Sequence, residues 1–192
     1  MKKARAAWRE EQPEMDVAKL VFVDESSAKT NMARLYGRGP VGERVEGSAP
    51  AGDWSTTTML SAVAIDGPRA PWVLEGAVDA EAFVTWVERV LVPTLDAGDV
   101  VVMDNLSAHK DPRVAAAVEA AGATVVYLPL YSPDFNPIEN MWSKVKAWLR
   151  KAAARTADTL LKAIAAGLAA VTPSDCRGFF GHCGYNVAAT SS

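Results

Sequence analysis

Residues 100–105 read Val-Val-Val-Met-Asp-Asn, an apolar run that ends in an acidic residue, Asp104. A short apolar run of this kind is typical of a buried strand. Residues 20–24, Leu-Val-Phe-Val-Asp, repeat the pattern and end in Asp24. Strands that carry an acid at the same end can bring their carboxylates to one edge of a sheet. The sequence therefore predicts a sheet with two acids close together at one edge.

The first half of the chain has the pattern of an antiparallel β-meander. Strands are expected at 19–24, 33–37, 54–65 and 72–74. Asp66-Gly67 suits a hairpin turn, and residues 48–53 are a turn-rich connection. Residues 2–12, rich in Ala, Lys, Arg and Glu, are expected to form a short exposed helix or tail, and we place a first segment at 1–17 on this basis.

The second half changes to alternating strands and helices. After a helix that Asp79 can cap, strands are expected at 99–103 and 124–128, and helices at 112–121, 137–152, 156–170 and 173–180. Short apolar strands that alternate with helices indicate parallel pairing. The predicted fold is α/β, with a mixed five-stranded sheet, an antiparallel meander followed by parallel strands, and helices on both faces.

The composition is that of a globular domain. The chain has 192 residues, of which 49% are apolar and 22% charged. No apolar run is long enough to span a membrane, and the charged N-terminus does not resemble a secretory signal. Two cysteines do not make a disulfide scaffold. We therefore expect a cytoplasmic location and no membrane partner.

The charge distribution is uneven. A net charge of −3 counts against a nucleic-acid partner, which usually meets a basic surface. Residues 138–162, however, carry six basic and two acidic side chains and are locally basic. A second basic group follows Asp24, and within it Arg38 is a candidate contact for DNA phosphate. We interpret the chain as an acidic domain with basic strips.

Three acids in separate elements favour metal-assisted phosphoryl chemistry. Besides Asp24 and Asp104 there is Glu139, in a segment that leads into a helix. Carboxylate oxygens are the hard ligands that Mg²⁺ and Mn²⁺ prefer. Two-metal catalysis places one cation at the attacking oxygen and the other at the leaving oxygen of a phosphate. The three acids are thus candidate catalytic residues and ligands of two ions.

Glu139 can be placed within its helix. Asn136 is a suitable N-cap and Pro137 a suitable first residue, so Glu139 is the third helical residue. Lys146 and Arg150 share its face of the helix, because residues advance by about 100° each. Glu139 would then bind metal while Lys146 and Arg150 contact DNA phosphates.

Each candidate also has an ordinary structural interpretation. Glu139 fits a capping box with Asn136, Asp24 fits a polar strand end, and Asp104-Asn105 fits the start of a turn. His109 could orient a water or contact phosphate, or simply bond to backbone. Lys110 could contact DNA or be an ordinary exposed lysine.

Some further residues are assigned to structure rather than chemistry. Asp134 is expected to stabilise its loop rather than bind metal. Trp142 and Trp148 lie on an apolar helical stripe and are expected in the core. The spacing of Cys176, His182 and Cys183 does not suit structural zinc, and their role stays open.

Three segments together resemble a known family. They are residues 22–26, residues 102–105 followed by His109-Lys110, and residues 128–142 followed by Lys146. The most specific part is Tyr-Ser-Pro-Asp-Phe-Asn-Pro-Ile-Glu at 131–139, with 34 residues, 105–138, between the second and third acids. Over about residues 18–170 the chain resembles the catalytic domain of DDE transposases, in the bacterial insertion-sequence branch of the mariner-like superfamily.

The resemblance implies a ribonuclease-H-like fold, with the catalytic domain at 18–192. It implies that Asp24, Asp104 and Glu139 bind two Mg²⁺ or Mn²⁺ ions. It further implies DNA strand cleavage at transposon ends and transfer of the 3′-hydroxyl into target DNA. Double-stranded DNA would be the partner, and synapsis of two ends would suit a homodimer.

One departure from the family concerns the N-terminus. Such transposases usually carry a helix-turn-helix region, and only about 18 residues precede the first strand here. A separate helix-turn-helix subunit is therefore expected to recognise the ends. The alternatives are a partial or inactive transposon-derived DNA-binding protein and a ribonuclease-H-like nuclease of another pathway. A haloacid-dehalogenase phosphatase is set aside because Ser26 occupies the position of its second Asp.

Overall fold

The computed structural model describes residues 2–34, 36–46 and 55–190. The expected connection at 48–53 and Trp54 lie outside these ranges. Over the part of the chain that is described, no helix is long and apolar enough to cross a membrane.

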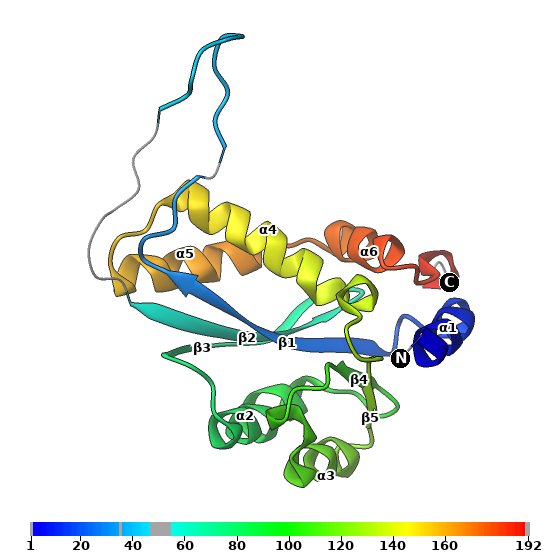
Figure 1. Ribbon diagram of the computed structural model, residues 1–192. Helices are drawn as coiled ribbons and strands as arrows, with labels where there is room; N and C mark the ends of the chain where they lie inside the picture. The colour runs from blue at the N-terminus through cyan, green and yellow to red at the C-terminus, as the bar shows by residue number, and fades with distance from the viewer. Residues whose placement is uncertain (1, 35, 47–54, 191–192) are drawn as a thin grey trace.

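A mixed five-stranded sheet forms the centre of the fold (Figure 1). Its strands are β1 (Leu20–Lys29), β2 (Thr56–Ala64), β3 (Gly67–Glu75), β4 (Val100–Met103) and β5 (Thr124–Tyr127). Their spatial order is β3-β2-β1-β4-β5. The first three strands pair antiparallel, while β4 and β5 are parallel to β1. The predicted meander followed by parallel strands is confirmed.

Two strand predictions need correction. β1 does not end at Asp24 but continues to Lys29, because β2 pairs with it along the whole of that extension. The strand expected at 33–37 is absent from the residues described in that range, which join no sheet. Gly37, Gly39 and Pro40 follow closely, and such residues disfavour strand pairing. This segment extends away from the sheet (Figure 1).

The helices lie close to their predicted positions. They are α1 (Lys2–Glu11), α2 (Ala80–Trp86), α3 (Pro112–Ala120), α4 (Pro137–Ala152), α5 (Ala157–Ala169) and α6 (Pro173–His182). A π-helical turn, Val87–Leu91, continues α2. Short 3₁₀ turns are η1 (Gln12–Glu14), η3 (Val92–Thr94), η4 (Ala108–Lys110), η5 (Pro133–Phe135) and η6 (Val187–Thr190). Asp79 caps α2 by accepting from the backbone N–H of Ala82, as predicted.

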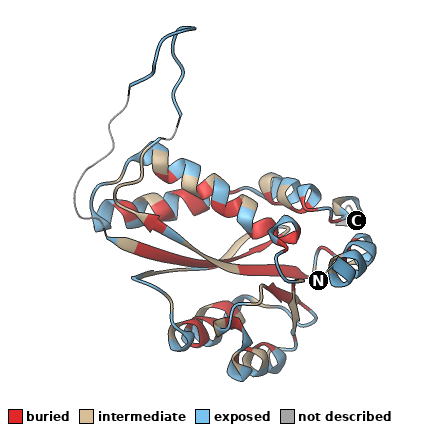
Figure 2. Cartoon of the chain, viewed as in Figure 1, coloured by how far each residue is buried: buried red, intermediate tan, exposed pale blue. Residues whose placement is uncertain are grey.

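Helices cover both faces of the sheet, as expected. α4, α5 and α6 lie on one face and α2 and α3 on the other (Figure 1). Alternate side chains of a strand point to opposite faces, so Phe22 packs in one core while Val21 and Val23 pack in the other. Figure 2 shows that the buried residues follow the strands and the sheet-facing sides of the helices.

The two tryptophans of α4 behave differently. Trp142 is buried in the core, but Trp148 is 41% exposed, so its predicted core position is wrong. Its ring lies over Gly167 of α5, where an added Cβ would meet Trp148 Cδ1 at 3.1 Å. Gly167 therefore lets α5 approach the indole closely, and one side of the ring faces solvent.

α1 is part of the fold rather than an exposed tail. Trp8 is only 7% exposed and belongs to the core on the α4–α6 side. Gln12, which follows the helix, is buried and donates from Nε2 to the carbonyl oxygen of Cys183 at 2.7 Å. Cys176 and Cys183 are buried free thiols in the same core. The first and last elements of the chain therefore pack together.

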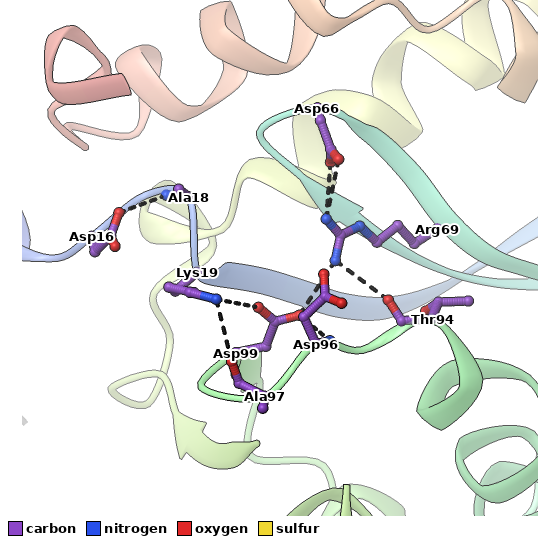
Figure 3. Close-up of polar contacts among 9 residues, drawn as sticks. All are labelled: Asp16, Ala18, Lys19, Asp66, Arg69, Thr94, Asp96, Ala97 and Asp99. Carbon is purple, nitrogen blue, oxygen red and sulfur yellow. Dashed lines mark hydrogen bonds and ion pairs between the residues drawn. The ribbon is translucent and has the colours of Figure 1, made fainter. Parts of the chain in front are cut away.

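The N-terminal end of β4 is closed by ion pairs around a buried acid, Asp99 (Figure 3). Its Oδ2 accepts from the backbone N–H of Asp96 at 3.0 Å and lies 3.4 Å from Nη1 of Arg69. Lys19 Nζ lies 3.9 Å from Oδ1. Arg69 also pairs with the exposed Asp66 at 3.1 Å. Two cations thus compensate one buried carboxylate at this end of the sheet.

Candidate active site

The strand register brings Asp24 and Asp104 together. Phe22 of β1 is aligned with Val102 of the parallel strand β4. Asp24 and Asp104 each follow these residues by two positions, so they lie side by side. β4 ends at Met103, and Asp104 leaves the sheet there. α4 begins nearby and contributes Glu139.

All three predicted acids line one cavity of about 400 Å³. The cavity lies among the C-terminal end of β4, the middle of β1 and the start of α4. Its other walls are Asn105, Leu106, Leu128, Pro129, Leu130, Tyr131, Ser132, Pro133 and Asn136. Three acids distant in sequence therefore share one concave surface.

Asp24 is the acid with the least compensation. Its Oδ1 accepts a hydrogen bond from the backbone N–H of Glu25 at 2.8 Å. Burial, followed by the negative charges of Glu25, Glu139 and Asp104, raises the pKa of Asp24 to about 8. Throughout the described ranges, no ion pair forms with Asp24 or Glu139. A carboxylate in such surroundings favours a proton or an external cation.

Asp104 has a cationic partner. Its Oδ1 accepts from the backbone N–H of Leu106 at 2.9 Å and lies 2.7 Å from Nδ1 of His109. Burial alone would raise the pKa of Asp104, but the contacts with His109 and Leu106 outweigh it and hold the pKa below its usual value. Asp104 therefore stays ionised, and the contacts with His109 and Leu106 fix the orientation of its carboxylate.

His109 bridges two acids. Its Nε2 lies 3.2 Å from Oε2 of Glu25, opposite the Asp104 contact. The ring also lies against Phe83, with centroids 4.4 Å apart. Burial lowers the pKa of His109, but the contacts with Asp104 and Glu25 outweigh it and raise the pKa to about 9. The ring is thus an imidazolium, although its Nδ1 lacks the alignment of a regular hydrogen bond to Asp104.

This position corrects the assignment of His109 to DNA. The side chain is 1% exposed and is enclosed by Phe83 and two carboxylates, so it does not reach a phosphate. The alternative of a histidine bonded to backbone does not describe the side chain either, because its ring nitrogens face carboxylates. His109 instead forms an ion pair that orients the Asp104 carboxylate, and Glu25 orients the His109 ring from its other nitrogen.

Glu139 is the third residue of α4 and is exposed, as the helix placement predicted. The capping-box interpretation fails, because the helix start has no side-chain cap. The Glu139 backbone N–H bonds instead to the carbonyl oxygen of Asn136 at 3.2 Å. The Glu139 carboxylate is therefore not used to cap its own helix.

The loop before α4 is fastened by a residue that sequence reasoning missed. Arg5 of α1 donates to Tyr131 O at 3.0 Å, to Ser132 Oγ at 2.8 Å and to both carboxylate oxygens of Asp134. Its guanidinium lies 4.7 Å from the ring centre of Phe135. Asp134 therefore stabilises the loop, as expected, but through an ion pair with α1.

The sequence signal for the missed residues was weak. Glu25 directly follows Asp24 and lies within the motif at residues 22–26, but nothing next to it indicates a contact with His109. Nothing in the first twelve residues indicates that Arg5 binds the loop before α4. The link between His109 and Glu25 joins residues 84 positions apart, so only the fold shows it.

The predicted DNA-contacting cations occupy different places. Lys110 is exposed beside Asp104, whose pKa its charge helps to lower. Lys146 and Arg150 are half-buried on α4, and Arg38 is exposed in the segment after β1. Other basic residues of the strip are engaged: Lys144 with Asp175, Lys162 with Asp158, and Arg155 with the carbonyl oxygens of Thr30 and Met32.

The donor set of the cavity fits a divalent cation. Its acidic members are hard oxygen ligands, and a cation would offset both the burial and the repulsion from neighbouring acids that raise the pKa of Asp24. In the described part of the chain, no three Asp, Glu, His or Cys side chains are already gathered tightly enough to hold one ion. The carboxylates share a cavity without converging on one point.

Comparisons with known proteins agree with this arrangement. The family model described as DDE superfamily endonuclease matches residues 19–161. No curated protein sequence matches the chain. Among solved structures, the mariner Mos1 paired end complex with Mg has a TM-score of 0.72 at 15% identity, and 98% of this chain covers 60% of that chain.

Two further Mos1 structures show the same fold. The Mos1 strand transfer complex has a TM-score of 0.70 at 16% identity, and 95% of this chain spans 56% of that chain. The catalytic domain of Mos1 mariner transposase has a TM-score of 0.67 at 14% identity, and 98% of this chain covers 90% of that domain. The predicted ribonuclease-H-like α/β fold is thereby confirmed. Because the family model spans most of its length, the chain belongs to the DDE superfamily of endonucleases.

Proposed function

We propose that this chain is a transposase catalytic domain that cleaves DNA strands at transposon ends and transfers the resulting 3′-hydroxyl into target DNA. The observation that carries the proposal is the cavity that Asp24, Asp104 and Glu139 line, in which Asp24 has no ion-pair partner among the described residues. Family membership and the likeness to Mos1 support it.

Asp24, Asp104 and Glu139 would hold two Mg²⁺ or Mn²⁺ ions. Such ions, when bound, supply charge stabilisation for the attacking and leaving oxygens of an in-line displacement. Among the structures similar in fold are Mos1 paired end complexes with Mn and with Mg. The protein's own contribution is to keep Asp104 ionised through His109 and Glu25, and to keep Asp24 and Glu139 free of competing cations.

DNA would lie over the cavity and along α4. Lys110, Lys146, Arg150 and Arg38 are the proposed phosphate contacts, because none of them has an ion-pair partner among the described residues. A separate helix-turn-helix subunit for recognising the ends, and a homodimer for synapsis, complete the proposal. The Mos1 chains, of which this chain spans 56–60%, are consistent with such additional parts.

The activity can be tested with the protein and DNA alone. Supercoiled plasmid is incubated with Mg²⁺ or Mn²⁺, and nicks are checked for extendable 3′-hydroxyl ends. We expect metal-dependent nicking by the wild type and none by Glu139→Gln, which keeps the size of the side chain but removes its charge. Equal nicking by the Glu139→Gln variant would exclude Glu139 from the chemistry.

DNA contact is tested separately through salt dependence. Lys146→Ala combined with Arg150→Ala should reduce the slope of log affinity against log salt by about 2, because each phosphate contact contributes roughly 0.9. The matched control removes two engaged cations: Lys162, which pairs with Asp158 of the same helix, and Arg113, which pairs with Asp111 and Glu81. A slope that changes equally in both variants would reject the DNA-facing assignment of α4.

A further inference from the structure

Asn136 starts α4 but does not use its side chain to cap the helix. It occupies the N-cap position, where an asparagine side chain usually accepts from a backbone N–H two or three residues on. No such bond forms here. Part of the reason is local, because the N–H of Glu139, one of the usual donors to an N-cap side chain, bonds to the backbone carbonyl oxygen of Asn136. The carboxamide is therefore available for another partner.

The carboxamide of Asn136 is instead buried in the wall of the acidic cavity. The residue is 3% exposed and lines the cavity together with the three acids. Its Nδ2 lies 3.5 Å from Oδ2 of Asp24, a long hydrogen bond. Its Oδ1 is fully buried and has no hydrogen-bond partner within the described chain. A buried carbonyl oxygen without a partner is unfavourable, and native proteins rarely keep one unless something binds it.

We propose that Asn136 is a positioning residue of the active site and an additional oxygen ligand for the cation that the acids bind. Its Nδ2 orients the Asp24 carboxylate, and its Oδ1 is a neutral hard oxygen of the kind that divalent cations accept. This inference rests on the proposed function, because it needs a divalent cation in the cavity.

An amide suits this position better than the other common capping residues. An aspartate would place a further carboxylate oxygen 3.5 Å from the Asp24 carboxylate, where the amide now donates. A serine would be too short to span from the helix start to the Asp24 carboxylate. Asparagine combines a donor for the acid with an oxygen for the cation and adds no charge.

The experiment compares two substitutions that both preserve a good N-cap. Asn136→Ser keeps a capping side chain but removes the carboxamide, and Asn136→Asp keeps the shape and an oxygen but replaces the donor with a charge. Asn140→Ser is the matched control, since Asn140 lies one turn later on α4 and contacts Cys183 Sγ rather than the cavity. Mn²⁺ affinity is measured by calorimetry, and melting temperature is measured with and without a chelator.

We expect Asn136→Ser to bind Mn²⁺ about 10- to 100-fold more weakly than the wild type. Its melting temperature in chelator should be no lower, because the helix gains a cap and loses a buried unpartnered oxygen. Asn136→Asp should melt at a lower temperature in chelator and gain more than the wild type from Mn²⁺. The Asn140→Ser control should bind Mn²⁺ as the wild type does.

The outcomes separate this inference from the proposed function. Wild-type affinity in Asn136→Ser would overturn the inference alone. Should that variant fail to fold, an Asn136→Asp protein that melts like the wild type in chelator would overturn it instead, because the carboxamide would then not face Asp24. A wild-type protein that binds no Mn²⁺ would overturn the proposed function and the inference together.

Discussion

The two ends of β4 each carry a carboxylate, and the protein treats them differently. At the N-terminal end, Asp99 is buried and faces Arg69 and Lys19 (Figure 3). At the C-terminal end, Asp104 faces His109, while its neighbour Asp24 has no cation among the residues described. We call the N-terminal end of β4 the closed end, because cations of the chain itself neutralise its acid. We call the C-terminal end the open end, because one of its two acids has no cationic partner in the described part of the chain.

The difference shows which acids serve the fold and which are available for chemistry. A buried carboxylate is costly unless a cation or hydrogen bonds compensate it. Asp99 has such compensation from side chains of the chain itself, so it needs nothing else. Asp24 accepts hydrogen bonds from Glu25 and Asn136 but has no cationic partner among the described residues, and the burial and like charges around it raise its pKa to about 8. The open end is therefore where an external cation adds the most stability.

Replacing Asp24 should have the largest effect on function. Asp24→Asn removes one proposed metal ligand, and several kcal/mol of transition-state stabilisation correspond to a loss of about 10³-fold or more in strand cleavage. Plasmid nicking with Mg²⁺ measures it. Cleavage at the wild-type rate would remove Asp24 from the site.

Asp24→Asn should lower cleavage but raise the stability of the metal-free protein. The folded-state pKa of Asp24 is about 8 and the ordinary value is 3.8, so ionisation of Asp24 lowers wild-type stability as the pH rises from about 4 to 8. Asp24→Asn lacks this decline. We expect the variant to be clearly more stable than the wild type at pH 8 in chelator, where the wild-type Asp24 is partly ionised, and equally stable near pH 4. Thermal melting at both pH values checks the sign.

Removing His109 should leave Asp104 without a cationic partner, as Asp24 already is within the described ranges. His109→Gln leaves Asp104 and Glu25 without their shared cation, and changes behind a metal ligand typically weaken metal binding by about 10- to 100-fold. Calorimetry with Mn²⁺ measures the loss. The control is His182→Gln, because His182 is the only other histidine and is exposed. Equal effects of the two substitutions would contradict the bridging role.

Removing the charge of Asp99 at the closed end should lower the stability of the fold and leave strand cleavage unchanged. Asp99→Asn keeps the side-chain shape but loses the charge between Arg69 and Lys19, which should cost about 1.5–3 kcal/mol. Denaturant unfolding measures the cost. Asp66→Asn is the matched control on the same arginine, and its 65% exposure predicts an effect below about 1 kcal/mol. Reduced cleavage by folded Asp99→Asn protein would contradict the division between the two ends.

The smallest effect is expected for the fastening of the loop at the open end. Arg5→Ala removes the contacts that hold residues 131–134, and a small loss of stability is expected. Cleavage should fall modestly, because the loop leads into Glu139. Arg9→Ala is the control, since Arg9 is more exposed and lies 3.7 Å from the same Asp134. Melting and nicking of both variants would show whether the fastening is specific to Arg5.

The elements that local pattern governs were predicted well. Strands 100–103 and 124–127 and helix 137–152 follow from apolar runs and turn residues that act within a few positions. The acids were found because a strand end or a helix start is a local signal, and the cavity that they line confirms that they lie together. Their metal-binding roles stay predictions.

The errors arose where distant segments decide the outcome. β1 continues past Asp24 because residues 56–60 of β2 pair with residues 25–29. Trp148 is partly exposed although its ring packs over Gly167 of α5. His109 is buried because Glu25 and Phe83 enclose it. None of these neighbours can be inferred from the residues next to the one predicted.

The amino-acid sequence by itself determined the order of strands and helices and the identity of the acids, because hydrophobic period and turn chemistry are properties of neighbouring residues. Only the tertiary structure decided how each acid is compensated. Electrostatic interactions depend on distance in space, so whether a carboxylate meets Arg69, His109 or the Asn136 amide is settled by folding. That difference in surroundings separates Asp99, which pairs with Arg69 and Lys19, from Asp24, which has no cationic partner among the described residues.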